Sequence, residues 1–329
     1  MNAFVFVLMA IFTFVVVAVR RLFKGPLHPG WSYRYEAIVE ILRKALVPRR
    51  EIPVHVMRKQ IVPSRIHPKV RALIDYERGT LGDSRSEIFT PKGWKESDPT
   101  LLYFHGGGYI VCSPATHRDL VSRIAVASGA RAIAIDYRKA PEHPFPLPID
   151  DCETAYRALL DSGVPAERIF VGGDSAGGGL TLAVLLRLRD AGLPLPRAGI
   201  LLSPWVDLEC QAESIPTNAR YDYLPATGLE WGRDQYLQGQ DWKHPHASPV
   251  HADLRGLPPL LMQTGSAELF LAENQLLAER AKEAGVPITH EVEPGMIHVF
   301  QAFASFVPEC EAAILRIGAF VREQYARAA

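Results

Sequence analysis

The chain has 329 residues, of which 48% are hydrophobic and 22% charged, so it can bury a large core and its composition argues against extended disorder. Lysine plus arginine and aspartate plus glutamate number 36 each. No basic stripe alternates with aromatic residues, which argues against nucleic acid as a partner. Length alone allows either one large α/β domain or two small domains.

The first element is an apolar run from Ala3 to Val19, interrupted only by Thr13. At about 1.5 Å per residue, a helix over this run is about 25 Å long, slightly short of a hydrocarbon core of about 30 Å. The two apolar residues that follow Arg21 extend the run to residues 3–23 if the arginines reach the lipid headgroups. We therefore predict a membrane anchor within residues 1–24.

The orientation and the fate of this segment have alternatives. Four basic residues follow the run and only the terminal amine precedes it, namely Arg20, Arg21, Lys24 and Arg34. This bias favours a single-pass anchor with the rest of the chain on the cytoplasmic side. The alternative is a signal peptide cleaved near Val16 and Ala18, which predicts a secreted protein, although no charged region precedes the apolar run.

The next segment reads as a linker followed by a helix. Two glycines and two prolines lie between Lys24 and Gly30 and are typical of a linker. Apolar residues from Ala37 to Leu46 then recur at helical spacing. We assign residues 25–83 to this linker and to amino-terminal cap helices, and residues 84–329 to the main domain.

From about Ser84 onward, short apolar runs alternate with helix-length amphipathic segments, which is typical of parallel strands joined by crossover helices. The predicted strands are Leu101–Phe104, Ala132–Ile135, Ile169–Gly172, Ile200–Leu202, Leu260–Thr264 and Ile288–Val292. The predicted helices are His117–Ser128, Asp150–Ser162, Ala176–Asp190, Glu273–Ala284 and Glu309–Ala326. The pattern predicts an α/β fold with a mostly parallel central sheet and helices on both faces. Residues 204–249 break the alternation with aromatic and polar residues of no clear period, so we interpret them as a cap insertion over a site.

The strongest chemical motif is Gly-Asp-Ser-Ala-Gly at residues 173–177. It follows a predicted strand and opens a predicted helix, which is the setting of a nucleophile elbow. A serine on such a strained turn leaves no room for bulky neighbours, so glycines flank it two positions away on either side. Ser175 is the candidate nucleophile.

A second motif lies about seventy residues upstream, where a predicted strand runs into His-Gly-Gly-Gly at residues 105–108. A backbone without side chains can point N–H groups at a developing negative charge. With the elbow, this indicates an oxyanion hole whose expected donors are the N–H groups of Gly107, Gly108 and Ala176.

These two motifs, with Asp-Tyr-Arg-Lys-Ala-Pro-Glu-His-Pro at residues 136–144 between them, closely resemble the hormone-sensitive-lipase family of esterases, which includes bacterial and arylacetamide-deacetylase-like members. The resemblance covers residues 84–329. It implies an eight-stranded α/β-hydrolase fold with a helical cap built from the amino-terminal helices and the insertion. Cys112 stands where the family pattern has a glycine, which bears on the shape of the acyl pocket.

The resemblance and the chain order serine, acid, histidine place the other catalytic residues after the elbow. His298 lies on a loop after the last predicted strand and is the expected base. Glu268 follows the strand Leu260–Thr264 and matches the family's acid position, which is usually aspartate. Glu273 is the alternative acid, and we interpret it as an exposed charge at a helix start.

Three further residues are expected to line the substrate pocket, namely Asp174, Tyr109 and Trp205. We expect no metal or organic cofactor. His244, His246 and His251 cluster, but prolines interrupt them and no acidic ligand lies at metal spacing, which favours a loop surface. The four cysteines have no metal-ligand spacing, and one disulfide stays an alternative.

The sequence therefore predicts a carboxylester hydrolase that acts on short to medium acyl esters, including lipid-like esters, through a Ser-His-Glu triad. The alternatives are a non-catalytic small-molecule-binding protein on the same fold and an amidase or deacetylase with the same triad. The oligomeric state is not predicted.

Overall fold

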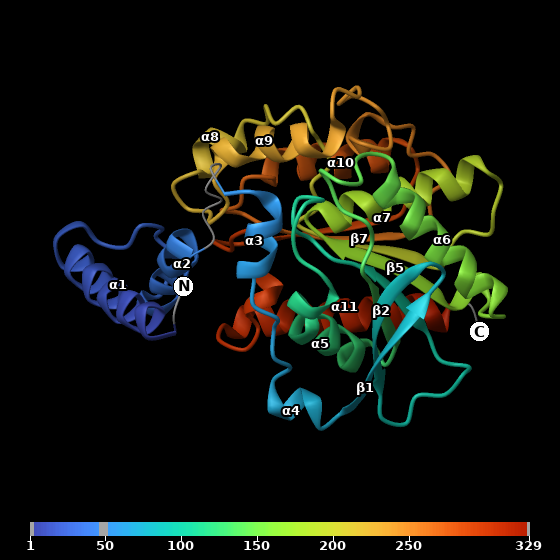
Figure 1. Ribbon diagram of the computed structural model, residues 1–329, viewed down its shortest axis with the longest axis horizontal. Helices are drawn as coiled ribbons and strands as arrows, with labels where there is room; N and C mark the ends of the chain where they lie inside the picture. Colours follow the sequence, from blue (N-terminus) through green and yellow to red (C-terminus); the bar gives the residue numbers. More distant parts are fainter. Residues whose placement is uncertain (1–2, 46–51, 328–329) are drawn as a thin grey trace.

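The computed structural model describes residues 3–45 and 52–327, and at the centre of these residues lies an eight-stranded sheet (Figure 1). The strand order is β1-β2-β4-β3-β5-β6-β7-β8. All neighbouring pairs from β4 to β8 are parallel, whereas β2 runs antiparallel to both of its neighbours. The six predicted strands are present as β3 Thr100–Phe104, β4 Arg131–Ile135, β5 Ile169–Asp174, β6 Ala198–Leu202, β7 Leu260–Gly265 and β8 Ile288–Glu293. The prediction of a mostly parallel α/β sheet is confirmed.

Two strands at one edge of the sheet were not predicted. β1 Ile74–Leu81 and β2 Ser84–Pro91 form an antiparallel pair, so the sheet begins ten residues before the expected start of the main domain at residue 84. β1 is the edge strand and is mostly exposed or half-buried, so it lacks the continuous apolar run by which the buried strands are recognised.

Helices cover both faces of the sheet, as predicted. α6 Leu147–Asp161, α7 Ala176–Asp190 and α10 Leu271–Glu283 pack their apolar residues into one core, and α5 Arg118–Ser128 and α11 Pro308–Ala326 pack into the other. Successive strand side chains point to opposite faces, so a single strand serves both cores. Along β3, Leu102 and Phe104 join the first core, while Leu101 and Tyr103 join the second.

The remaining helices belong to the amino-terminal segment and to the insertion. They are α1 Ala3–Lys24, α2 Tyr33–Ala45, α3 Val54–Gln60, α4 Pro68–Arg71, α8 Ser214–Asn218 and α9 Ala226–Leu237. The predicted apolar position Leu46 lies outside the described residues. The two segments touch where Arg43 of α2 donates a hydrogen bond to the Ala219 carbonyl at 3.1 Å. Figure 1 shows α1 and α2 projecting from the side of the domain.

Candidate active site

The turn between β5 and α7 holds Ser175 in a strained conformation, with φ of 53° and ψ of −123°. A side chain at Gly173 or Gly177 would overlap the carbonyl oxygen of Phe104 at the end of β3. The turn therefore forms only with glycine at both positions, because the backbones of β5 and α7 both pass close to the end of β3. The serine is 9% exposed and is the N-cap residue directly before α7.

The candidate site residues lie beyond the carboxyl ends of parallel strands, where sites in open α/β sheets form. The glycine turn follows β3, Ser175 follows β5, Glu268 follows β7 and His298 follows β8. Since β3, β5, β6, β7 and β8 are consecutive in the sheet, their loops share one edge. Residues almost two hundred positions apart in the sequence are thereby brought to one edge.

His298 and Glu268 face each other inside the protein. Nδ1 of the imidazole lies 3.8 Å from Oε1 of the carboxylate, and the two residues are 2% and 0% exposed. The other carboxylate oxygen accepts hydrogen bonds from the Ser203 hydroxyl and the Gly265 N–H, both at 2.7 Å. These two donors fix which oxygen of Glu268 turns toward the imidazole.

The imidazole is also held by an aromatic neighbour. The Phe270 ring meets the His298 ring edge-on, with 5.0 Å between centroids. Within the described residues no hydrogen bond joins the Ser175 hydroxyl to His298. Catalytic hydrogen bonds of this kind often tighten only when substrate is bound.

The glycine turn has the backbone conformation that the sequence motif requires. Gly107 and Gly108 have φ of 119° and 61°, and a side chain at Gly107 would overlap the Val111 carbonyl. In the described part of the chain neither glycine N–H donates to a protein acceptor. The N–H of Ala176 is the first of α7 and has no intrahelical acceptor. All three predicted oxyanion donors are therefore free to bind a ligand.

Asp174 braces the elbow from behind. Its Oδ1 accepts hydrogen bonds from the Tyr103 hydroxyl at 2.8 Å and from the Gly106 N–H at 3.1 Å, and its Oδ2 lies 3.2 Å from Nε2 of His117. Burial acts to raise the pKa of Asp174, but His117 and these hydrogen bonds outweigh it and hold the pKa below its usual value. Both carboxylate oxygens contact other residues of the protein, so in this structure Asp174 supports the backbone of the elbow.

Tyr109 and Trp205 belong to one buried aromatic row. The Tyr109 ring stacks on Tyr236 of α9 with 3.8 Å between centroids and on Trp205 at 5.7 Å, and Trp205 stacks on Phe270 at 5.8 Å. A Cβ atom on Gly108 would lie 4.0 Å from the Trp205 ring. The aromatic row therefore runs from Tyr236 in the insertion, past the glycine turn, to Phe270, which contacts the imidazole of His298.

Cys112 stands at the position where the family pattern has a glycine, and its φ of 68° lies in the left-handed region that favours glycine. Burial raises the pKa of its thiol to about 11. All four cysteines are free, so the alternative of a disulfide is not realised.

The interpretation of Glu273 as an exposed charge is wrong. The residue is 2% exposed, and its Oε1 accepts hydrogen bonds from the N–H groups of Val206 at 2.9 Å and Asp207 at 3.4 Å. Burial raises its pKa well above the usual value. It lies at the start of α10 as predicted, but this end of the helix packs under the loop that carries Trp205.

Two residues that connect the acid and histidine loops were missed by sequence reasoning. The Ser203 hydroxyl donates to Glu268 and accepts from the Val299 N–H at 3.0 Å. Asp222, 1% exposed, accepts from the N–H of Leu269 at 2.9 Å through one oxygen and from the N–H of His298 at 3.3 Å through the other. The position of Ser203 directly after a strand was a usable signal, but nothing in the spacing of the insertion marks Asp222.

Asp222 predicts a pH dependence of stability. Burial raises its pKa from an ordinary value near 4 to about 6, with Glu268 adding to the rise and His298 opposing it. The folded state thus favours the protonated carboxyl of Asp222. The contribution of this carboxyl to the free energy of unfolding is complete below about pH 4 and is lost as the pH rises to about 6. The loss is about 3 kcal/mol for a shift of this size. In Asp222→Asn the side chain stays neutral, so the variant should gain stability relative to wild type across this window.

Urea unfolding of both proteins between pH 4 and pH 7.5 measures this difference. Carboxyl groups distant from Asp222 have the same surroundings in the two proteins and cancel in the comparison. A difference in unfolding free energy that stays constant over the whole range would contradict the assigned titration.

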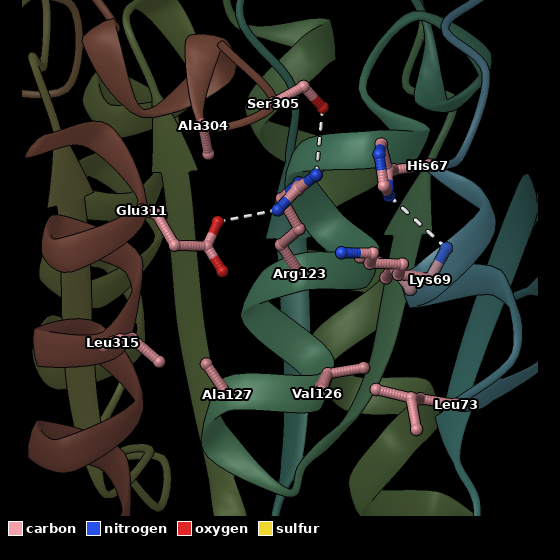
Figure 2. A pocket seen from close by; sticks show the side chains of 11 residues that line it. His67, Lys69, Leu73, Arg123, Val126, Ala127, Ala304, Ser305, Glu311 and Leu315 are labelled. Atoms are coloured by element: carbon pink, nitrogen blue, oxygen red, sulfur yellow. Dashed lines mark hydrogen bonds and ion pairs between the residues drawn. The ribbon is translucent and has the colours of Figure 1, made fainter. Parts of the chain in front are cut away.

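A separate surface cavity of about 340 Å³ lies between α4, α5 and α11 (Figure 2). Figure 2 shows the Arg123 guanidinium turned toward Glu311 and Ser305, to which it is bonded at 2.6 and 2.9 Å. None of the predicted site residues is among its lining residues in the described structure. The cavity is distinct from the site at the strand ends.

Known proteins resemble this chain over most of its length. A family model described as an alpha/beta hydrolase fold matches residues 101–302. An acetyl-hydrolase of Streptomyces hygroscopicus is 45% identical over 244 residues, which cover 74% of this chain and 81% of that protein. An esterase of Acinetobacter venetianus is 36% identical over 222 residues, covering 67% of this chain and 73% of its own.

Solved structures resemble it equally well. A crystal structure of an esterase/lipase from an uncultured bacterium has 43% identity and a TM-score of 0.82, covering 88% of this chain and 97% of that one. An esterase from the bacterial hormone-sensitive lipase family has 40% identity and a TM-score of 0.84, covering 90% and 99%.

The parallel sheet and the sharp turn between β5 and α7 define the class as an α/β hydrolase. Within this class the chain belongs to the hormone-sensitive-lipase family. It is a serine carboxylesterase.

Proposed function

We propose that the chain hydrolyses carboxylic esters through an acyl-enzyme on Ser175, with His298 as general base and Glu268 as the acid of the triad. The observation that carries this proposal is the buried pair of His298 and Glu268, 3.8 Å apart, at the strand edge that also carries the strained serine. Glu268 holds the imidazole in the tautomer whose Nε2 can accept a proton, and it stabilises the imidazolium that forms.

In the proposed reaction, His298 takes the hydroxyl proton while Oγ of Ser175 attacks the ester carbonyl carbon. The N–H groups of Gly107, Gly108 and Ala176 bind the resulting oxyanion. The intermediate collapses, and the imidazolium gives its proton to the departing alcohol. Water then attacks the acyl group by the same route, which releases the acid and restores the serine.

We propose short to medium acyl esters as substrates. The aromatic row of Tyr109, Trp205 and Tyr236 fills the space beside the glycine turn, and the Trp205 ring comes within 4.0 Å of the position of a side chain on Gly108. We assign residues 25–73, which precede strand β1, and residues 204–249 to a cap that limits access to this space. The acetyl group named for the relative from Streptomyces hygroscopicus is consistent with a small acyl pocket.

We further propose that the chain associates with membranes through residues 3–23, with its catalytic domain on the cytoplasmic side. Among the described residues, one helix, Phe6–Lys24, is long and apolar enough to cross a bilayer. Lipid-like esters are therefore included in the proposed substrate class. The proposal requires that the amino terminus is not cleaved, which the intact mass of the purified protein tests. Loss of the first eighteen residues would instead indicate secretion.

A fluorophosphonate label tests the chemical proposal, because it reacts with an activated serine. We expect mass spectrometry of the labelled full chain to find the adduct on Ser175, with labelling competed by p-nitrophenyl acetate. Matched ester and anilide substrates should show a preference for the ester. An adduct on another residue would refute the assigned nucleophile, and equal amide turnover would favour an amidase.

A further inference from the structure

Helix α1 is held along α2 as an antiparallel hairpin (Figure 1). Near the middle of α1, the Lys44 ammonium donates to the Thr13 hydroxyl at 2.9 Å. The Tyr33 hydroxyl donates to the Phe14 carbonyl at 2.7 Å. These polar contacts bind the apolar helix to the folded domain over its carboxyl-terminal half.

A buried ion cluster closes the hairpin at its base. Glu36 of α2 is 0% exposed and pairs with both Arg20 and Arg21 of α1, and Arg21 also donates to the Trp31 carbonyl at 3.1 Å. A buried carboxylate without its partners is strongly destabilising. Arg20 and Arg21 are therefore structural parts of the domain as well as flanks of an apolar run.

The two faces of α1 differ sharply. Thr13 and Val17 face α2 and are 1% exposed each. The opposite face is a continuous apolar stripe that the described chain leaves uncovered, formed by Val7, Leu8, Ile11, Phe12, Val15, Val16, Val19, Leu22 and Phe23. Its members recur three and four positions apart, so the stripe follows the helix, which is about 33 Å long, from Val7 to Phe23.

This arrangement does not let α1 cross a bilayer. From Thr13 to Lys24 the helix lies beside α2, which carries Glu36, Glu40 and Lys44 toward it. Charged groups at that depth in hydrocarbon are costly. Only residues 3–12 extend beyond α2, and ten residues span about 15 Å of a core of about 30 Å.

We propose that α1 lies flat on an anionic bilayer, with its apolar stripe at the boundary between headgroups and acyl chains, as a monotopic helix. The stripe contains no polar side chain that would specify a protein partner, and the exposed residues Lys24 and Arg34 at the base of the hairpin complement anionic lipid. In a dimer packed through the two stripes, Lys24 and Arg34 of both copies would approach one another, and their like charges would repel. A bilayer is therefore favoured over a second copy. The inference rests on the proposed membrane association and refines it from spanning to surface binding.

The hairpin of α1 and α2 also contacts the loop that carries His298. The Trp31 indole donates to the Gly295 carbonyl at 2.5 Å, and the Tyr35 hydroxyl accepts from the Ile297 N–H at 3.2 Å. Both contacts lie within three residues of His298. Surface binding through α1 therefore holds the histidine loop beside the lipid, which suits amphiphilic esters that partition into the bilayer.

Flotation of the full chain with vesicles tests binding. We expect the wild type to float with phosphatidylcholine vesicles that contain phosphatidylglycerol, and less with phosphatidylcholine alone. The variant Phe12→Glu, Val16→Glu, Val19→Glu should lose at least ten-fold in the bound fraction. A matched control with three exposed apolar residues elsewhere, Leu276→Glu, Phe306→Glu, Leu315→Glu, should bind like wild type. Turnover of a water-soluble ester without vesicles should be the same in all three proteins.

Depth measurements separate a surface helix from a spanning one. Single replacements Leu8→Cys, Val15→Cys and Phe23→Cys, labelled with an environment-sensitive fluorophore, should be quenched equally by shallow spin-labelled lipids, with unsubstituted protein as the background control. A deep label at one position would overturn the surface orientation while leaving membrane association intact. Failure of the wild type to bind would overturn both, and a lipid-free dimer that the stripe variant abolishes would assign the stripe to a second copy instead.

Discussion

Replacing Ser175 with alanine is expected to lower kcat for p-nitrophenyl acetate by roughly 10⁶-fold, which is the scale of loss when the nucleophile of a serine hydrolase triad is removed. The substrate carbonyl then has no attacking group, although the oxyanion donors and the pocket are intact. Alanine keeps a Cβ atom in the same strained backbone position, so thermal unfolding should stay close to wild type.

The matched control is Ser162→Ala, since the hydroxyl of that serine donates to the Leu159 carbonyl at the end of α6, away from the strand edge that carries the site. It should retain wild-type kcat. Stopped-flow measurements before steady state should show a burst of p-nitrophenol only in proteins with Ser175. A Ser175→Ala protein with more than one per cent of wild-type turnover, free of contaminating esterase, would remove the proposed mechanism.

Replacing Glu268 with glutamine is expected to lower kcat by about 10⁴-fold with little change in KM. The Ser203 hydroxyl and the Gly265 N–H both donate to one carboxylate oxygen, so the glutamine carbonyl must take that place. Its amide nitrogen then faces Nδ1 of His298 and donates to it. The imidazole proton moves to Nε2, which can no longer accept the proton of Ser175.

Glu273→Gln is the corresponding control, because Glu273 was the alternative acid and is equally buried. Burial raises the pKa of Glu273, and glutamine keeps an oxygen for the Val206 and Asp207 N–H groups. We expect kcat within about three-fold of wild type. If Glu273→Gln instead lost more activity than Glu268→Gln, the assignment of the acid would have to be reversed.

The central sheet could be predicted because its strands are buried on both faces and therefore read as apolar runs. The boundaries of α7 matched the prediction, since a strand, a sharp turn and a helix must follow one another around Ser175. β1 was missed because an exposed edge strand carries no such run. β2 was missed because three of its buried residues, Ser84, Ser86 and Glu87, are polar. The local sequence pattern therefore predicts a strand where its apolar residues are fully buried, and it does not do so where the strand is only partly buried or its buried residues are polar.

The site was predictable only where a residue follows a motif or a strand. His298 and Glu268 each lie on a loop after a recognised strand, so their meeting could be expected. Asp222 comes from the irregular insertion, and its contacts with two distant loops depend on tertiary packing that no local spacing records. The burial of Glu273 was missed for the same reason, since a helix start does not reveal what packs over it.

The position of Asp222 has a consequence for how such enzymes can be engineered. One carboxyl group of the insertion holds the backbone of both Leu269 and His298, so the insertion and the catalytic loops form one mechanical unit. A chimera can take this segment from a relative in order to change the substrate range. Such a chimera replaces the pocket wall and, with it, a side chain that positions the catalytic loops. Transplants that preserve an acceptor at this position should keep their turnover, and those without one should fold yet work poorly.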